Sequence, residues 1–193
     1  VEGAPLEKVA METEIYGLSI VPATIDLSSA DIDLISNEKR SHLLHEALRK
    51  KQENKKKYDF ILIDCPPSLN ILTVNAMVAS HSVLIPLQSE FFALEGLSQL
   101  LLTVKEVRQT ANENLRVEGI VLTMFDGRNN LSKQVEADAR SNLKELVFKT
   151  IIPRNVRVSE APSYSMPVLT YDPSSKGSKA YMDLAKELLA NNS

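Results

Sequence analysis

Short apolar runs alternate with amphipathic stretches along most of the chain. Residues 60–63 (FILI) are continuously apolar, with charged residues before them and Pro66 soon after. Such a run predicts a strand that is buried on both faces, as in a parallel sheet. Further strands are predicted for the following segments: 18–22, 82–87, 119–124, 150–152 and 168–169.

Helical patterns fill most of the intervals between these runs. In 94–107 the apolar residues recur at the spacing of one helix face. Further helices are predicted for 43–51, 72–79, 132–146 and 178–189. Strands that alternate with helices predict βαβ units with right-handed crossovers. We therefore expect one α/β domain over 1–193, with a mostly parallel sheet and helices on both of its faces.

Composition restricts the class of protein. The chain is 44% hydrophobic and 24% charged, and no apolar run reaches the length of a membrane span. Its first residues lack the pattern of a signal peptide, and a single cysteine, Cys65, fits a reducing compartment. We therefore expect a cytoplasmic protein. The net charge of −3 argues against a protein coated in nucleic acid, although residues 144–179 hold six basic against three acidic residues.

Asp64 is the first candidate for chemistry, because it follows the apolar run 60–63 directly. Open α/β sheets bind ligands at the carboxyl ends of their strands, where a carboxylate can hold Mg²⁺ through water. Pro66 and Pro67 stiffen the chain that leaves the strand, which suits a loop that directs backbone groups at a phosphate. The spacing is equally compatible with Asp64 as the cap of the following helix.

Five blocks of sequence resemble the ParA/Soj branch of the deviant-Walker P-loop ATPases, a class that also includes MinD. The blocks are YDFILIDCPPSLNILTVNA (58–76), IPLQSEFFALEGLSQLL (85–101), LTMFDGRNNLS (122–132), IIPRNVRVSEAPSYSMPV (151–168) and YDPSSKGSKAYMDLAKEL (171–188). The resemblance implies an ATP hydrolase with ATP and Mg²⁺ as ligands. It gives Asp64 the catalytic role of supporting Mg²⁺ through water and the attacking water. The residues that it places beside the nucleotide are Pro66, Pro67, Thr123, Met124, Asp126 and Pro153.

The same resemblance implies a role in chromosome or plasmid segregation. Arg154 and Lys176 would contact the backbone of non-specific DNA in an ATP-bound homodimer. A ParB-type partner would stimulate hydrolysis, and the protein would associate with the nucleoid rather than a membrane. The alternative is a membrane-cycling regulator like MinD. The last eight residues, KELLANNS, hold one lysine and no aromatic residue, which argues against that alternative.

A phosphate loop is absent from the 193 residues. It needs the pattern GxxxxGK[ST], because its backbone N–H groups surround the phosphates and its lysine neutralises them. None of the six glycines begins that pattern. We therefore expect the family's N-terminal phosphate-loop segment to lie outside these residues, and the 193 residues alone to be catalytically inactive. A third hypothesis is a non-catalytic remnant that acts only by association.

The cysteine, the histidines and two glutamates are weaker candidates. Cys65 alone cannot hold an iron–sulfur cluster, which needs four thiolates. The three histidines do not have the spacing of a ligand cluster. Glu90 and Glu95 flank two phenylalanines and could belong to a dimer face, as the resemblance implies. An interaction with the helix dipole explains Glu90 almost as well.

Overall fold

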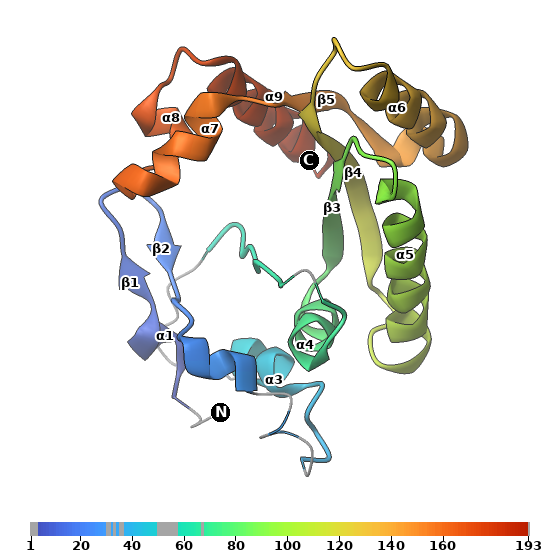
Figure 1. The fold of residues 1–193 in the computed structure, drawn as a ribbon. Helices are drawn as coiled ribbons and strands as arrows, with labels where there is room; N and C mark the ends of the chain where they lie inside the picture. The colour runs from blue at the N-terminus through green and yellow to red at the C-terminus, as the bar shows by residue number, and fades with distance from the viewer. Residues whose placement is uncertain are drawn as a thin grey trace. The chain divides into compact units, whose positions relative to one another are not determined.

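The computed structural model describes residues 4–29, 32, 34, 37–49, 58–66 and 68–192. These residues form two compact units, each described here by itself (Figure 1). The first unit takes the described residues of Val1–His81 and Thr103–Leu115. The second unit takes those of Ser82–Leu102 and Arg116–Ser193. Helix α5 (Ala93–Thr110) contributes residues to both.

A parallel sheet forms the centre of the second unit. Its strands are β3 (Ser82–Gln88), β4 (Arg116–Phe125) and β5 (Val147–Pro153), in the order β3-β4-β5. They confirm the strands predicted in 82–87, 119–124 and 150–152. Apolar, β-branched runs are well suited to strands that are covered on both faces, which is why the sequence identifies these three segments.

Helices cover both faces of this sheet (Figure 1). On one face, Ile120 and Leu122 pack with Leu97 of α5 and Ala139 of α6 (Asn130–Leu143). Because side chains alternate along a strand, the intervening Val121 points to the other face. There it packs with a second apolar cluster, which contains the following residues: Phe148, Ile152 and Leu184 of α9 (Lys176–Asn191). The predicted α/β architecture is therefore confirmed.

The outer edge of β5 is protected by a carboxylate from α9. Glu187 accepts hydrogen bonds from the backbone N–H groups of Lys149 (2.7 Å) and Thr150 (2.9 Å). Burial alone would raise the pKa of Glu187, but these hydrogen bonds and the Lys149 charge bring it below its usual value. Unpaired N–H groups on an edge strand invite pairing with another chain, so this contact protects the edge while it attaches α9 to the sheet.

Three short helical elements link β5 to α9. They are α7 (Val156–Glu160), η3 (Ala161–Tyr164) and α8 (Val168–Tyr171). A further short element, η2 (Lys144–Leu146), precedes β5. The strand predicted at 168–169 is wrong, because these residues begin the helical turn α8. Pro167 stands at its N-cap, and the Ser178 hydroxyl donates to the Val168 carbonyl (2.9 Å), which holds the turn in place.

The first unit is largely helical. Its elements are α1 (Leu6–Val9), β1 (Met11–Glu12), β2 (Ser19–Ile20), η1 (Ile25–Ser29), α3 (Leu43–Arg49), α4 (Ile71–Ala79) and the end of α5. The prediction for 18–22 is confirmed over β2, which pairs antiparallel with β1. The Asn112 side chain donates to the carbonyls of Met77, Val78 and Ser80, and so attaches the segment after α5 to the end of α4.

Residues 60–63 do not form the predicted strand. They have no regular secondary structure, and the Leu62 side chain is 84% exposed. A strand forms only by pairing with another strand. In the part of this unit that the structure describes, β1 and β2 pair with each other and no strand pairs with 60–63. The apolar pattern therefore identified a segment with the composition of a strand, but it did not identify a neighbouring strand with which the segment could pair.

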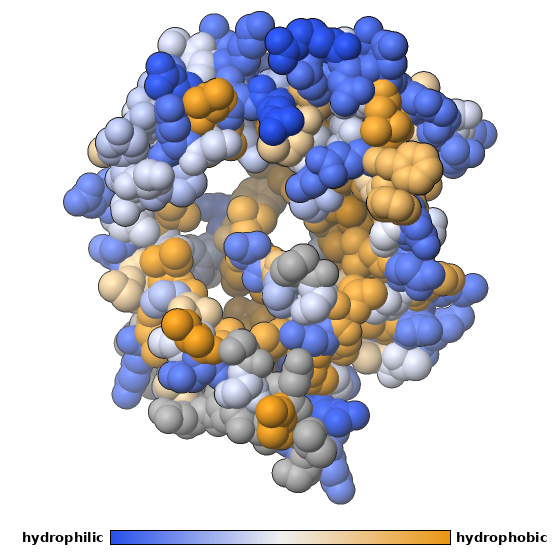
Figure 2. All heavy atoms as spheres, in the orientation of Figure 1, coloured by the Kyte–Doolittle hydropathy of each residue, from blue (hydrophilic) through white to orange (hydrophobic). Residues whose placement is uncertain are grey.

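None of the described helices combines the length and the apolar character of a membrane span. Apolar side chains nevertheless reach the surface near the start of α5, as Figure 2 shows. Phe91 and Phe92 are both more than 70% exposed there, and their rings meet edge to face with centroids 5.0 Å apart. The surface over α9 and the β4–α6 loop is mainly hydrophilic in the same view.

Candidate functional site

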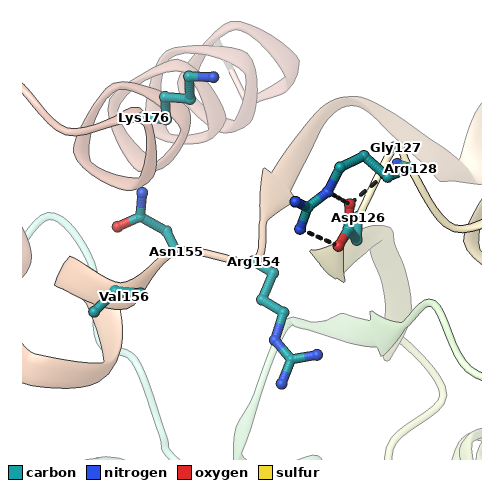
Figure 3. Close-up of a pocket in the computed structure, with 7 residues that line it drawn as sticks. All are labelled: Asp126, Gly127, Arg128, Arg154, Asn155, Val156 and Lys176. Atoms are coloured by element: carbon teal, nitrogen blue, oxygen red, sulfur yellow. Dashed lines mark hydrogen bonds and ion pairs between the residues drawn. The ribbon is translucent and has the colours of Figure 1, made fainter.

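A cleft of about 500 Å³ opens in the second unit where β4 and β5 end. Its lining residues are Asp126, Gly127, Arg128, Arg154, Asn155, Val156 and Lys176 (Figure 3). The cleft therefore brings together three of the predicted site residues: Asp126, Arg154 and Lys176. Its position at the carboxyl ends of parallel strands is the position where open α/β sheets bind ligands.

The end of β4 carries a β-bulge. The pairs Leu122↔Ile151 and Phe125↔Pro153 leave two residues of β4 opposite Ile152 alone on β5. Those two residues, Thr123 and Met124, are both predicted site residues. Met124 has a φ of 53°, which is uncommon for a residue other than glycine. Thr123 and the predicted Pro153 are half-buried at the strand ends, whereas Met124 is 42% exposed.

Asp126 is engaged by Arg128 in a two-point ion pair. Arg128 donates from Nε to Oδ1 (3.0 Å) and from Nη2 to Oδ2 (2.8 Å), as Figure 3 shows, and its backbone N–H also donates to Oδ1 (3.0 Å). The hydrogen bonds from Arg128, with the charges of Arg128 and Arg154, lower the pKa of Asp126 to about 2. Arg128 was missed by sequence reasoning, although an arginine two residues after Asp126 could have suggested the pair.

Arg154 and Lys176 are the two remaining cations of the cleft. The Arg154 backbone N–H donates to the Phe125 carbonyl (2.9 Å), which fixes the point where the side chain leaves β5. Lys176 begins α9. Both residues are exposed, and neither forms an ion pair with any carboxylate of the described residues. Their side chains extend from different walls of the cleft (Figure 3). They therefore offer two positive charges that form no ion pair with the acidic side chains of the described residues.

Close packing between α7 and α9 sets the position of Lys176. The Asn155 side chain accepts from the backbone N–H groups of Arg157 (3.0 Å) and Val158 (3.3 Å) and so caps α7. Gly177 lies directly over this cap. A Cβ atom on Gly177 would lie 2.4 Å from Cγ2 of Val158, which is much closer than ordinary van der Waals contact. Glycine therefore permits the approach that carries Lys176 to the cleft.

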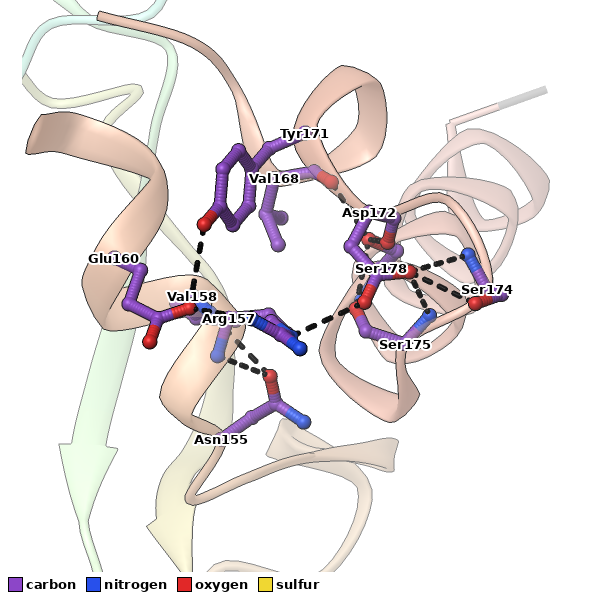
Figure 4. A network of polar contacts seen from close by, with 10 residues as sticks. All are labelled: Asn155, Arg157, Val158, Glu160, Val168, Tyr171, Asp172, Ser174, Ser175 and Ser178. Atoms are coloured by element: carbon purple, nitrogen blue, oxygen red, sulfur yellow. Dashed lines mark hydrogen bonds and ion pairs between the residues drawn. The ribbon is translucent and has the colours of Figure 1, made fainter. Parts of the chain in front are cut away.

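A polar network holds the other side of α7 (Figure 4). Arg157 pairs with Glu160 (2.8 Å) and with Asp172 (3.4 Å). The buried Ser178 hydroxyl donates to the carbonyls of Val168 (2.9 Å) and Asp172 (2.6 Å). These contacts connect α7, α8 and α9. The two arginines of this region therefore differ. Arg157 is paired within the network, whereas Arg154 lines the cleft.

Asp64 lies in the first unit. It is exposed, and its carboxylate makes no hydrogen bond or ion pair with any described residue. The alternative that Asp64 caps the following helix is wrong, because the Asn70 side chain caps α4 by accepting from Leu72 and Thr73. Pro66 is also exposed in this unit, whereas Pro67 lies outside the described residues. Burial and the Asp64 charge raise the pKa of the neighbouring Cys65 thiol.

Among the described residues, the metal-binding side chains suit Mg²⁺ better than zinc. No cluster of three or more His, Cys, Asp or Glu side chains that could hold a metal occurs in the described parts of the chain. A zinc-type site is therefore not built from those residues. A single free carboxylate such as Asp64 fits Mg²⁺, which keeps several waters and takes its other ligands from a phosphate.

Comparisons with known proteins identify relatives of this chain. The family model of the AAA domain matches residues 1–117. The chromosome partitioning protein ParA of Caulobacter vibrioides is 51% identical over 187 residues, which are 97% of this chain and 70% of that protein. The sporulation initiation inhibitor protein Soj of Bacillus subtilis is 48% identical over 191 residues, which are 99% of this chain and 74% of that protein.

Solved structures show the same fold. Cobyrinic acid a,c-diamide synthase from Mycobacterium smegmatis, with bound ADP and magnesium, has a TM-score of 0.76 and 33% identity. The match covers 96% of this chain and 67% of that one. The cell division ATPase MinD from Pyrococcus furiosus has a TM-score of 0.74 and 25% identity, and the match covers 97% of this chain and 71% of that one.

Proposed function

The chain belongs to the ParA/Soj family of chromosome-partitioning ATPases, and we propose that it forms part of an ATP-switched, non-sequence-specific DNA-binding ATPase. The DNA-binding part rests on the cleft at the ends of β4 and β5, where two cations form no ion pair with any described acidic side chain. The family and the cleft support a proposal in which the base of the nucleotide and the DNA both bind in the second unit, near the ends of β4 and β5.

In the hydrolytic step, Asp64 is the catalytic residue. With Mg²⁺ bound, its carboxylate would hold water molecules of the metal and would orient the water that attacks the terminal phosphate. When bound, Mg²⁺ neutralises charge on the phosphates. Pro66, which follows Asp64 closely, is assigned to the same phosphate, and so is Pro67, which lies outside the described residues. Support comes from the exposed carboxylate, which pairs with none of the described residues, and from Asn70, which caps α4 in its place.

The base of the nucleotide lies against the end of β4. Thr123, Met124, Asp126 and Pro153 form this side of the site in our proposal. The bulge supports it, because strained backbone and β-bulges concentrate at functional sites. Similar solved structures hold ADP or an ATP analogue together with magnesium, which supports the same ligands here.

Arg154 and Lys176 bind the phosphate backbone of DNA without reading its sequence. Lys and Arg contacts to phosphates supply non-specific affinity and make it salt-dependent. Arg128 is not assigned this role, because Asp126 already neutralises it. The active species is an ATP-bound homodimer on the nucleoid, and a ParB-type partner stimulates hydrolysis and release. These last assignments follow from the family.

The 193 residues alone do not hydrolyse ATP in this proposal, because none of their glycines begins a phosphate loop. Tests of activity therefore need a second protein, which we call the loop-bearing form. It consists of the 193 residues preceded by the phosphate-loop segment of a ParA/Soj relative.

The DNA assignment is tested by single substitutions in the ATP-loaded loop-bearing form. Arg154→Ala and Lys176→Ala should each weaken binding to unrelated duplexes by similar factors, because backbone contacts carry no sequence information. Each should also lower the slope of log K against log salt by about one unit. Lys144→Ala is the matched control, since it removes one charge before β5, at the end of the strand away from the cleft. Unchanged affinity and slope in both test variants would refute the assignment.

A further inference from the structure

Two buried serines hold the bulged end of β4. Ser89 and Ser132 are each only 3% exposed. Ser89 follows β3, and it donates to the Thr123 carbonyl from its backbone N–H (3.3 Å) and from its hydroxyl (3.4 Å). Ser132 lies in the first turn of α6, and its hydroxyl donates to the Ser89 carbonyl (3.3 Å). One residue, Ser89, therefore contacts both ends of the segment 123–132.

The segment closed by Ser89 contains the residues that line this side of the site. Met124, Asp126 and Arg128 all lie within it. A turn inside it is held by the Asn129 N–H, which donates to the Asp126 carbonyl (2.9 Å), and the Asn129 side chain caps α6. The positions of the bulge and of Asp126 therefore depend on where the two ends of the segment are held.

Buried hydroxyl groups at these two positions need an explanation. A hydroxyl removed from water costs free energy unless it is hydrogen-bonded, and alanine would fill almost the same space without that cost. Met124 has an unfavourable backbone conformation, which persists only where surrounding contacts impose it. Ser89 and Ser132 supply such contacts from β3 and α6.

We propose that Ser89 and Ser132 are positioning residues that fix segment 123–132 against the base of the nucleotide. The inference rests on the proposed function, because the segment faces a base only if nucleotide binds at this sheet edge. Neither serine touches the nucleotide. They act through the Thr123 carbonyl and the start of α6, and so set the geometry of Met124 and Asp126.

The first test uses the 193 residues without nucleotide. Ser89→Ala and Ser132→Ala each remove one hydroxyl, and Ser98→Ala is the matched control because the exposed Ser98 hydroxyl only donates within α5. Amide hydrogen exchange should become about fivefold faster over 124–131 in both test variants, the size expected for one lost hydrogen bond. Exchange in the centre of β4 should stay unchanged. Unchanged exchange over 124–131 in both variants would overturn the inference.

The second test uses the loop-bearing form and separates positioning from stability. Each test variant should raise KM for ATP about fivefold while kcat changes little, because the segment contacts the base and not the phosphates. The preference for ATP over GTP should fall by a similar factor. Unchanged KM and preference, with faster exchange, would leave the serines purely structural and overturn the inference. A parental loop-bearing form that binds no ATP would instead overturn the proposed function, and this inference with it.

Discussion

Gly177→Ala is the substitution that tests the geometry of the cleft most sharply. The added Cβ would lie 2.4 Å from Cγ2 of Val158 and 3.3 Å from Cγ of Asn155. Since ordinary contacts begin near 3.4 Å, the Val158 side chain, the capped start of α7 or α9 must move by about 1 Å. Overpacking of this kind costs about 1–3 kcal/mol, with about 2 kcal/mol as the middle of that range, and the better helix propensity of alanine returns at most about 1 kcal/mol.

The expected net loss is therefore about 1–2 kcal/mol, which lowers the melting temperature by roughly 2–8 °C for a chain of this size. Thermal unfolding followed by circular dichroism measures it on the 193 residues. Gly96→Ala is the matched control, because it lies in α5 with nothing within 4 Å of the added Cβ. That control should gain up to about 1 kcal/mol. A Gly177→Ala protein that melts at or above the parental temperature would refute the close α7–α9 packing.

Two further predictions concern carboxylates. The pKa of Asp126 is held at about 2, below its ordinary 3.8, so its contribution to stability is complete above 3.8 and is lost as the pH falls towards about 2. In Asp126→Asn, the free energy of unfolding should depend less on pH over that interval. An NMR titration that gave the Asp126 carboxyl an ordinary pKa would contradict its pairing with Arg128. In the loop-bearing form, Asp64→Ala should lower turnover by on the order of 10²-fold or more while ATP binding changes far less. An Asp64→Ala protein that hydrolyses ATP at the parental rate would show that Asp64 has no catalytic role.

Sequence reasoning succeeded where burial alone decides the structure. The apolar runs that became β3, β4 and β5 carry the signal of a doubly covered sheet in their own residues. It failed at 60–63 because a strand also needs a partner, and the identity of that partner is not encoded in the run itself. At Val168 the apolar, β-branched residue suggested a strand, but contacts from Ser178, ten residues away, hold a helical turn.

The candidate site could be predicted only in part. The order of blocks identified Asp126, Arg154 and Lys176, which the fold places around one cleft. The pairing of Arg128 with Asp126 depends on a turn that follows the bulge, and the spacing of two residues hints at the pair without showing that the turn brings the two side chains together. Ser89 and Ser132 are 43 residues apart and look like ordinary polar residues. Only the structure shows that both serines are buried and that the Ser132 hydroxyl donates to the Ser89 carbonyl.

Equilibrium binding of Mg²⁺-ATP to the 193 residues and to the loop-bearing form, followed by hydrolysis of the bound ATP, tests the central claim most directly. The loop-bearing form should bind ATP in a Mg²⁺-dependent manner and hydrolyse it, because it combines a phosphate loop with Asp64 and the end of β4. The 193 residues alone should bind ATP negligibly and show no hydrolysis above background. Failure of the loop-bearing form to bind ATP, or tight Mg²⁺-dependent binding by the 193 residues alone, would contradict the proposal.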